Sequence, residues 1–245
     1  MKGKNIMGSI SLNKDNAGVG NGATLVEDDG SAQKGMRFGA KWDASSRGQS
    51  GVLGFLSRKG GLDIDLIGVL MQGTKAVKYV GLDSLDPLRA QGSPVKHSGD
   101  SITGEDNKKK LKKSGLTPEQ IEMLDDESID VTSFAAIPLD YTSIFFTASV
   151  FKKGGMADAS QDKGFQGANN VEFRVYSFGP DGTPVEDALI MPDLGATANC
   201  CLIAKVSRTS LTDPMAPWKI EVLEEMVSVT RGDIESLLKH CRQRA

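Results

Sequence analysis

The sequence is poor in several kinds of residue that would mark a functional class. It contains no run of about 18 apolar residues, so no segment is expected to span a membrane. Only two histidines are present, His97 and His240, which argues against a histidine-rich transition-metal centre. Lysine and arginine total 29 against 32 aspartate and glutamate, and the resulting net charge of −3 disfavours a general nucleic-acid binder.

Cysteine is also scarce. The three cysteines, Cys200, Cys201 and Cys241, are odd in number and lack the spacing of a metal site, so we expect buried free thiols in a reducing compartment. The first residues, 1–5, carry positive charges without an apolar segment after them, unlike a secretory signal. We therefore expect a cytoplasmic protein that is not itself a membrane protein.

Aromatic residues make up only 6% of the chain, whereas glycine is abundant with 28 residues. Glycine-rich turns joining short apolar runs favour an all-β architecture. Apolar or alternating patterns predict strands over residues 37–44, 62–72, 171–175, 199–206 and 218–224, edge strands at 10–12 and 23–26, and a central strand covered on both faces at 141–151. We predict a single domain over residues 1–245, a β-sandwich of two mainly antiparallel sheets.

Two segments predict short helices. Residues 106–124 form a lysine-rich segment in which Thr117 and Pro118 mark a helix start. Residues 230–243 predict a C-terminal helix, with Thr230 and Asp233 resembling a capping box and an apolar stripe that ends at Cys241.

Acidic residues are the most unusual feature. Asp63 and Asp65 interrupt an apolar strand, and the period of two puts both on one face, where they could converge on a cation. Alternatively, that end of the strand is exposed, or Arg58 or Lys59 neutralises the pair. Two further acidic segments, residues 98–107 and 125–130, could add the oxygen ligands that Ca²⁺ requires, although solvated turns have the same composition.

Several motifs then follow in a specific order: KWDA at 41–44, LDIDL at 62–66, HSGD and TGE within 97–105, DDESI at 125–129, F-x4-N-x3-R at 165–174 and PWK at 217–219. This series resembles the landmarks of the TerD family of tellurium-resistance and stress proteins. The resemblance covers residues 37–225. It implies a two-sheet sandwich that binds one or two Ca²⁺ ions through its acidic loops and has no established enzymatic activity.

The resemblance also implies the ligands and the partners. By position, the metal ligands would be Asp63, Asp65, Asp100, Glu105, Asp125, Asp126, Glu127 and Asn170. The partners would be proteins of a resistance or stress complex, including a membrane-associated one. We expect a cytoplasmic, non-catalytic, calcium-binding adaptor.

The insertion at 106–124 departs from the family pattern, which normally has only a few residues there. It brings lysines 108, 109, 110, 112 and 113 close in sequence to the acidic site, which leaves the number of ions open. The alternative function is a metal-independent interaction protein that uses this insertion to bind an acidic partner or membrane surface. A metal-dependent enzyme acting on phosphorylated substrates has no nucleophile or base in its favour.

Overall fold

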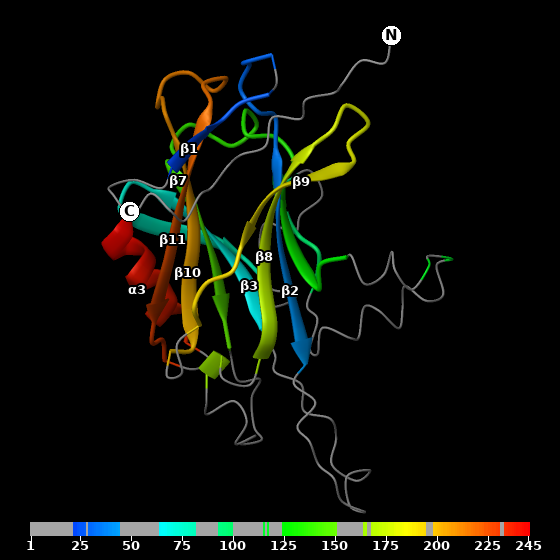
Figure 1. The fold of residues 1–245 in the computed structure, drawn as a ribbon. Coiled ribbons are helices and arrows are strands. Elements are labelled where there is room, and N and C mark those ends of the chain that lie inside the picture. Colours follow the sequence, from blue (N-terminus) through cyan, green and yellow to red (C-terminus); the bar gives the residue numbers. More distant parts are fainter. Residues whose placement is uncertain are drawn as a thin grey trace, which may run out of the picture.

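The structure is a computed structural model that describes residues 22–27, 29–44, 64–81, 93–99, 115, 117, 124–150, 164–165, 168–194, 198–230 and 233–245. These residues form two antiparallel sheets that pack face to face (Figure 1). In spatial order, the six-stranded sheet consists of β1 (Gly22–Leu25), β11 (Trp218–Val227), β10 (Cys200–Arg208), β7 (Ser143–Ser149), β3 (Asp65–Gln72) and β4 (Lys75–Val80). The five-stranded sheet consists of β5 (Val95–His97), β6 (Glu127–Val131), β2 (Met36–Ala44), β8 (Ala168–Phe178) and β9 (Pro184–Ile190).

The main core lies between the two sheets. Alternate residues of β2 point into it, and the ring of Phe38 stacks on Phe146 of the opposite sheet with centroids 4.6 Å apart. Phe173 of β8 lies on the same ring at 6.3 Å. The predicted central strand is confirmed, because β7 lies between β10 and β3 and all its residues are buried. The all-β sandwich is therefore confirmed as well.

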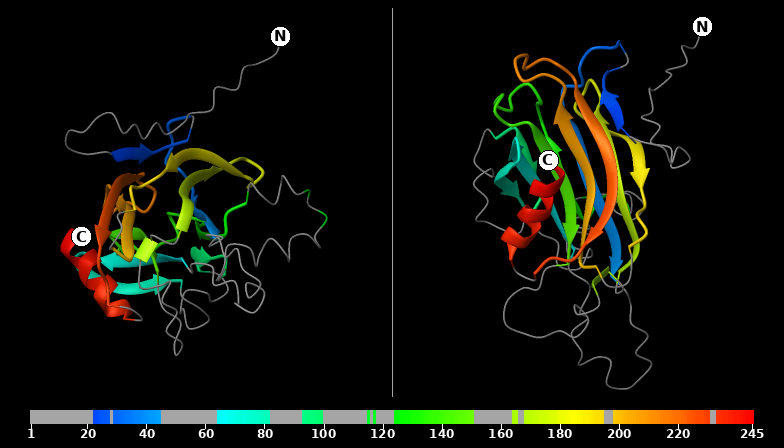
Figure 2. Two further views of the ribbon diagram at one scale, coloured as in Figure 1. Left: turned by 60° about the horizontal axis from the view of Figure 1, so that its bottom comes forward. Right: turned by 90° about the vertical axis from the view of Figure 1, so that its left-hand side faces the viewer.

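A second apolar cluster covers the outer face of the six-stranded sheet. There, α3 (Ile234–Arg244) lies against the six-stranded sheet (Figure 2). Its buried residues Leu237 and Cys241 belong to one cluster with apolar residues of β3 and β10. The C-terminal helix is confirmed, but its predicted start is corrected. Asp233, not Thr230, is the N-cap, because its carboxylate accepts the N–H of Glu235. All three cysteines lie in the described residues and are buried free thiols, as expected.

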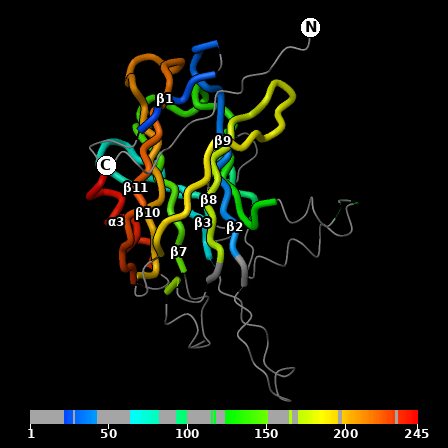
Figure 3. Tube along the Cα trace, viewed as in Figure 1, coloured from blue at the N-terminus to red at the C-terminus, as the bar shows by residue number. Residues whose placement is uncertain are grey.

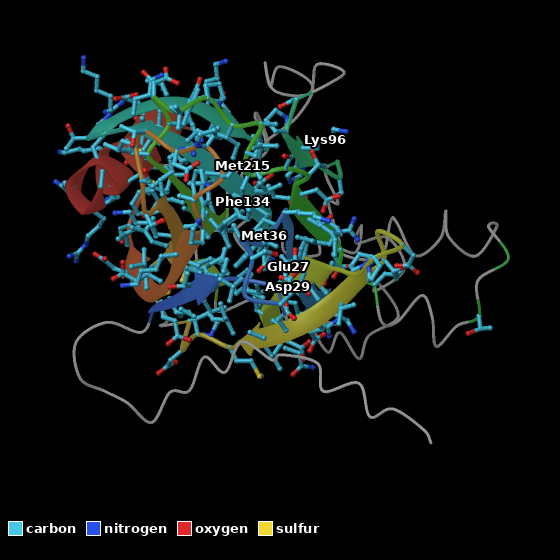
Figure 4. The ribbon with its side chains drawn as sticks, turned by 90° about the horizontal axis from the view of Figure 1, so that it is seen from above. Glu27, Asp29, Met36, Lys96, Phe134 and Met215 are labelled. Atoms are coloured by element: carbon cyan, nitrogen blue, oxygen red, sulfur yellow. The ribbon has the colours of Figure 1, made fainter. Side chains whose placement is uncertain are left out.

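The upper end of the sandwich is closed by aromatic and cationic side chains. Phe134 stacks on Trp218 at 5.0 Å, and the guanidinium of Arg208 lies 4.7 Å from the centre of the same indole. Arg208 also donates to the carbonyls of Tyr141 and Ile137 and so holds the segment after β6. The view from above shows Phe134 within this end, close to the exposed Met215 of the β10–β11 connection (Figure 4).

The structure also contains strands that the sequence patterns did not indicate, namely β4, β5 and β9. The strand that the family resemblance implies after the DDE group is present as β6, which begins at Glu127. The predicted insertion helix and the predicted strand at 10–12 lie outside the described residues, apart from positions 115, 117 and 124 of the insertion.

Candidate functional site

One end of the sandwich brings several acidic motifs together. At this end β2, β5 and β7 finish while β3, β6 and β8 begin, so their termini meet at the bottom of the trace (Figure 3). We call it the acidic end and define it by Trp42, Asp65, His97, Asp126 and Glu127. The antiparallel register brings these residues here from four separate stretches of sequence, because opposite strand ends meet in such sheets.

Asp126 extends the hydrogen-bonded ladder of the five-stranded sheet by means of its side chain. The last backbone pairing between β2 and β6 joins Ala40 to Glu127, so Trp42 lies beyond the end of β6. The carboxylate of Asp126 accepts the N–H of Trp42 at 2.9 Å, while its own N–H donates to Ala40 at 2.8 Å. This buried carboxylate therefore satisfies a backbone donor that no strand reaches.

Glu127 connects the two sheets. Its carboxylate crosses from β6 and accepts the N–H of Leu66 on β3 at 2.8 Å. Pairing between β3 and β4 begins only at Gly68, so this donor also lies outside the backbone ladder. The same oxygen of Glu127, Oε2, is 3.3 Å from Nε2 of His97, and both side chains are only 1% exposed. Glu127 thus joins three strands at one buried point.

Asp65 adjoins this point. It is the first residue of β3 and is 7% exposed. The N–H that Glu127 binds belongs to the peptide bond between Asp65 and Leu66. It pairs across the sheet with Ser149 of β7. Strand alternation places it with Ile67 on the outer face of the six-stranded sheet, whereas Glu127 reaches β3 from the inside.

Asp125 points elsewhere. Its carboxylate lies over Gly39 on the outer face of the five-stranded sheet. There it accepts a hydrogen bond of 3.0 Å from the phenol hydroxyl of Tyr176. The guanidinium of Arg174 is 3.9 Å away. Burial raises the pKa of Asp125 to about 6, although Tyr176 and Arg174 oppose the shift. Burial, and then the charge of Asp125, raise the pKa of Tyr176, which keeps the phenol a donor.

The outer face around Asp125 is a network of ion pairs. Arg174 lies 2.6 Å from Glu172 on its own strand and 3.7 Å from Glu186 of β9. Beside it, both carboxylate oxygens of Asp130 accept from the guanidinium of Arg37, at 2.6 and 2.9 Å. Asp125 therefore belongs to the paired charges of a sheet face, and the structure does not bring it together with the two acids that follow it.

Of the remaining predicted site residues, the structure describes Asn170. Asn170 lies on β8 at the acidic end, exposed and with a left-handed φ of 50°, where β8 bulges against β2. Asp63, Asp100 and Glu105 lie outside the described residues. In the sequence, Asp63 directly precedes Ile64 and Asp100 directly follows Gly99, both of which are described.

The donor set of the acidic end is consistent with a hard cation, because it consists of carboxylate oxygens. In the part of the chain that the structure describes, however, no group of three or more His, Cys, Asp or Glu side chains could by itself hold a metal ion. Asp126 and Glu127 each already have one oxygen accepting a backbone N–H. Since Ca²⁺ takes six to eight oxygens, the described residues supply only part of such a site.

Sequence reasoning missed the structural roles of His97 and Tyr176. In the sequence, His97 is one of two histidines and begins the HSGD motif, yet its ring contacts Glu127 thirty positions away. Tyr176 lies two residues after Arg174 on β8, so both side chains point to the same face of the sheet. This spacing is the signal that could have linked Tyr176 to the F-x4-N-x3-R pattern.

The structure also bears on the membrane question. Among the residues that the structure describes, no helix is long and apolar enough to cross a membrane.

Comparisons with known proteins give matches at the level of structure. No family model matches the chain, and neither does any curated protein. A homologue of the telluride resistance protein TerD from Streptomyces coelicolor A3(2) matches with a TM-score of 0.55 and 13% identity, over 84% of this chain and 96% of that chain. A protein of unknown function matches with a TM-score of 0.50 and 14% identity, over 80% and 93%. The chain therefore has a TerD-like fold, as its ordered motifs predicted.

Proposed function

We propose that this protein binds Ca²⁺ at the acidic end and acts as a non-catalytic adaptor in a stress or tellurite-type resistance response. The observation that carries the proposal is the pair Asp126 and Glu127. These two consecutive carboxylates are each 2% exposed and lie where the strand termini meet.

The energetic argument concerns buried negative charge. Removing a carboxylate from water costs several kcal/mol unless partners compensate it. Two neighbouring buried carboxylates also repel each other. A divalent cation would lower both costs, in addition to the hydrogen bonds that the carboxylates accept from the backbone of Trp42 and Leu66. Ion binding would then stabilise the folded state in proportion to RT ln(1 + [Ca²⁺]/Kd).

The proposed ligands follow from this placement. Asp126 and Glu127 form the centre of the site, with Asp65 adjoining them. The site would be completed by Asp63, which precedes Ile64 in the sequence, and by Asp100 and Glu105, which follow Gly99. The exposed amide of Asn170 is a further oxygen donor at the same end. Asp125 is left to the outer face, where Tyr176 and Arg174 hold it.

The adaptor role rests on the resemblance and on the fold. We propose that the ion orders the acidic end so that it presents a surface to protein partners, one of them membrane-associated. The three free buried thiols support a reducing, cytoplasmic setting.

The two tryptophans of the chain allow a direct test. Trp42 binds Asp126 through its backbone at the acidic end, whereas Trp218 lies at the opposite end of the sandwich beside Phe134. Tb³⁺, a luminescent substitute for Ca²⁺, should therefore be sensitised through Trp42. We expect Trp42→Phe to lose most of the emission, Trp218→Phe to keep it, and excess Ca²⁺ to quench it. Emission that survives in Trp42→Phe and disappears in Trp218→Phe would place the ion elsewhere.

A further inference from the structure

Two loops at the upper end of the sandwich carry few charges. We call residues 132–142, which join β6 to β7, the first upper loop, and residues 209–217, which join β10 to β11, the second upper loop. Only two of their twenty residues, Asp140 and Asp213, are charged, although charged residues make up 25% of the chain. Each of these carboxylates already accepts a hydrogen bond within the protein. Depletion of charged residues is a property of the centre of protein interfaces.

The second upper loop holds the two most exposed large apolar side chains of the described residues. Leu211 is 60% exposed and Met215 is 67% exposed, whereas the next, Met191, is 51% exposed. Single exposed apolar residues are common, but two within one short loop form a patch that calls for a partner. The first upper loop adds smaller exposed apolar residues at the same end, namely Ala135, Ala136 and Pro138.

The second upper loop is held in one shape. Inside it, the carboxylate of Asp213 accepts a backbone N–H at 2.8 Å, two residues further along the chain. Both its ends are fixed to the first upper loop. Before it, Arg208 donates to the carbonyl of Tyr141 at 2.8 Å, and after it, Trp218 stacks on Phe134. A surface that is already ordered loses little conformational entropy on binding, which favours association.

A rim of mixed charge borders the upper loops. The β1–β2 connection adjoins the first upper loop, because the carbonyl of Lys34 accepts the N–H of Phe134 at 2.8 Å. This connection exposes Lys34 and Asp29, and Lys219 is exposed just after the second upper loop. Figure 4 looks down on this end, with Asp29, Phe134 and Met215 labelled. Charges of both signs on a rim can be matched between two identical surfaces, whereas charges of one sign would repel.

We infer that the upper loops are the surface through which two copies of this chain pair about a two-fold axis. Such an axis brings the same surface of each copy together, so every charge near it faces like charge. The upper loops nearly avoid that cost. They also contain no lysine or arginine, the residues that attract anionic lipid, and they offer little to a strongly charged partner. A second copy, with its own uncharged apolar loops, is the partner that fits.

The pairing goes beyond the proposed function and does not depend on an ion. The upper loops lie at the end of the sandwich opposite the acidic end, where Trp42 is bound to Asp126. Pairing through the upper loops would therefore leave both acidic ends free.

The test is sedimentation equilibrium of the full chain in chelator. Between about 1 and 200 μM, we expect the wild type to pass from the chain mass of 26.1 kDa towards twice that mass, with a Kd of about 100 μM or tighter. Leu211→Ser/Met215→Ser should pair at least about tenfold more weakly. Its melting temperature at the lowest concentration should equal that of the wild type, because both side chains are exposed in the single chain.

The chain offers a matched control. Leu189 and Met191 are the same residue types, 46% and 51% exposed, at the end of β9 and just after it. Leu189→Ser/Met191→Ser should pair as the wild type does. Loss of pairing in this control, with pairing kept in Leu211→Ser/Met215→Ser, would place the interface at β9 and overturn the inference.

Three further results would overturn it. The first is a wild type that keeps the mass of a single chain at every concentration. The second is a lower melting temperature of Leu211→Ser/Met215→Ser at the lowest concentration, which would show that the chain itself covers these side chains. The third is a monomeric wild type that sediments with phosphatidylcholine vesicles through Leu211 and Met215, which would assign the surface to lipid.

Discussion

The carboxylate of Asp125 occupies the space above Gly39 that a side chain on β2 would otherwise fill. A Cβ atom at position 39 would lie 2.1 Å from Oδ2 of Asp125, far inside van der Waals contact. Glycine is therefore required on this strand for a steric reason, although its backbone is ordinary β-strand. This arrangement separates Asp125 from Asp126 and Glu127, which serve the acidic end.

Gly39→Ala should destabilise the protein by about 1–3 kcal/mol, because the new methyl group must displace a buried carboxylate from Tyr176 and Arg174. Urea unfolding would measure the loss. Adding Asp125→Ala should recover part of it, so the two changes should be less than additive. Gly179→Ala, where the nearest atom is 3.3 Å away, is the control. Strict additivity would contradict the proposed steric relationship.

Asp125 should make stability depend on pH with an unusual sign. Its pKa in the folded state, about 6, is above the ordinary value of 3.8, so between these values the folded protein binds more protons than the unfolded chain. Stability from this group is therefore present below about pH 4 and is lost as the pH rises through 6, by up to about 3 kcal/mol. Asp125→Asn should remove this fall. Urea unfolding of both proteins from pH 4 to 7 measures it, and parallel pH profiles would contradict the assignment.

Removal of the Glu127 side chain should be costly even without calcium. Glu127→Ala leaves the N–H of Leu66 without its buried acceptor and removes the carboxylate that lies 3.3 Å from the ring of His97, so we expect a loss of about 3 kcal/mol in chelator. Glu127→Gln keeps one acceptor oxygen for Leu66 and should lose less. Thermal unfolding in chelator compares the two variants. If alanine and glutamine were equally well tolerated, Glu127 would not join the sheets.

The thiols should be unreactive in the folded protein. Burial raises the pKa of Cys200 to about 12 and also raises the pKa of Cys201 and Cys241. We expect all three to react with a thiol reagent at pH 8 only after addition of denaturant. Rapid reaction of Cys241 in the native protein would show that α3 detaches readily from the six-stranded sheet.

The strands and the helix that the sequence predicted are those with strong patterns. The β7 segment is apolar on both faces, and the α3 stripe carries Leu237 and Cys241 at helical spacing. The strands that were missed are edges or very short. β4 has only one buried residue, β5 has three residues in all, and β9 starts at a proline and carries two acids in its middle.

The candidate site shows a different limit of sequence reasoning. The ordered acids lie near one end of the sandwich, but Asp125 and Asp126 precede β6, so strand alternation does not set the directions of their side chains. Asp125 faces outward to Tyr176, Asp126 follows the sheet edge to Trp42, and Glu127 faces inward to Leu66. The contact between His97 and Glu127 depends on the register of β5 with β6, which no local pattern specifies.

The central claim, calcium binding at the acidic end, is tested most directly by calorimetric titration of chelator-stripped protein with Ca²⁺. The isosteric double variant Asp126→Asn/Glu127→Gln is the comparison, and Asp130→Asn, which changes an acid paired with Arg37 on the outer face, is the matched control. We predict a Kd of about 10 μM or tighter for the wild type and the control, and at least about hundredfold weaker binding for the folded double variant. Absence of binding heat in the wild type, or equal affinity in the double variant, would contradict the account.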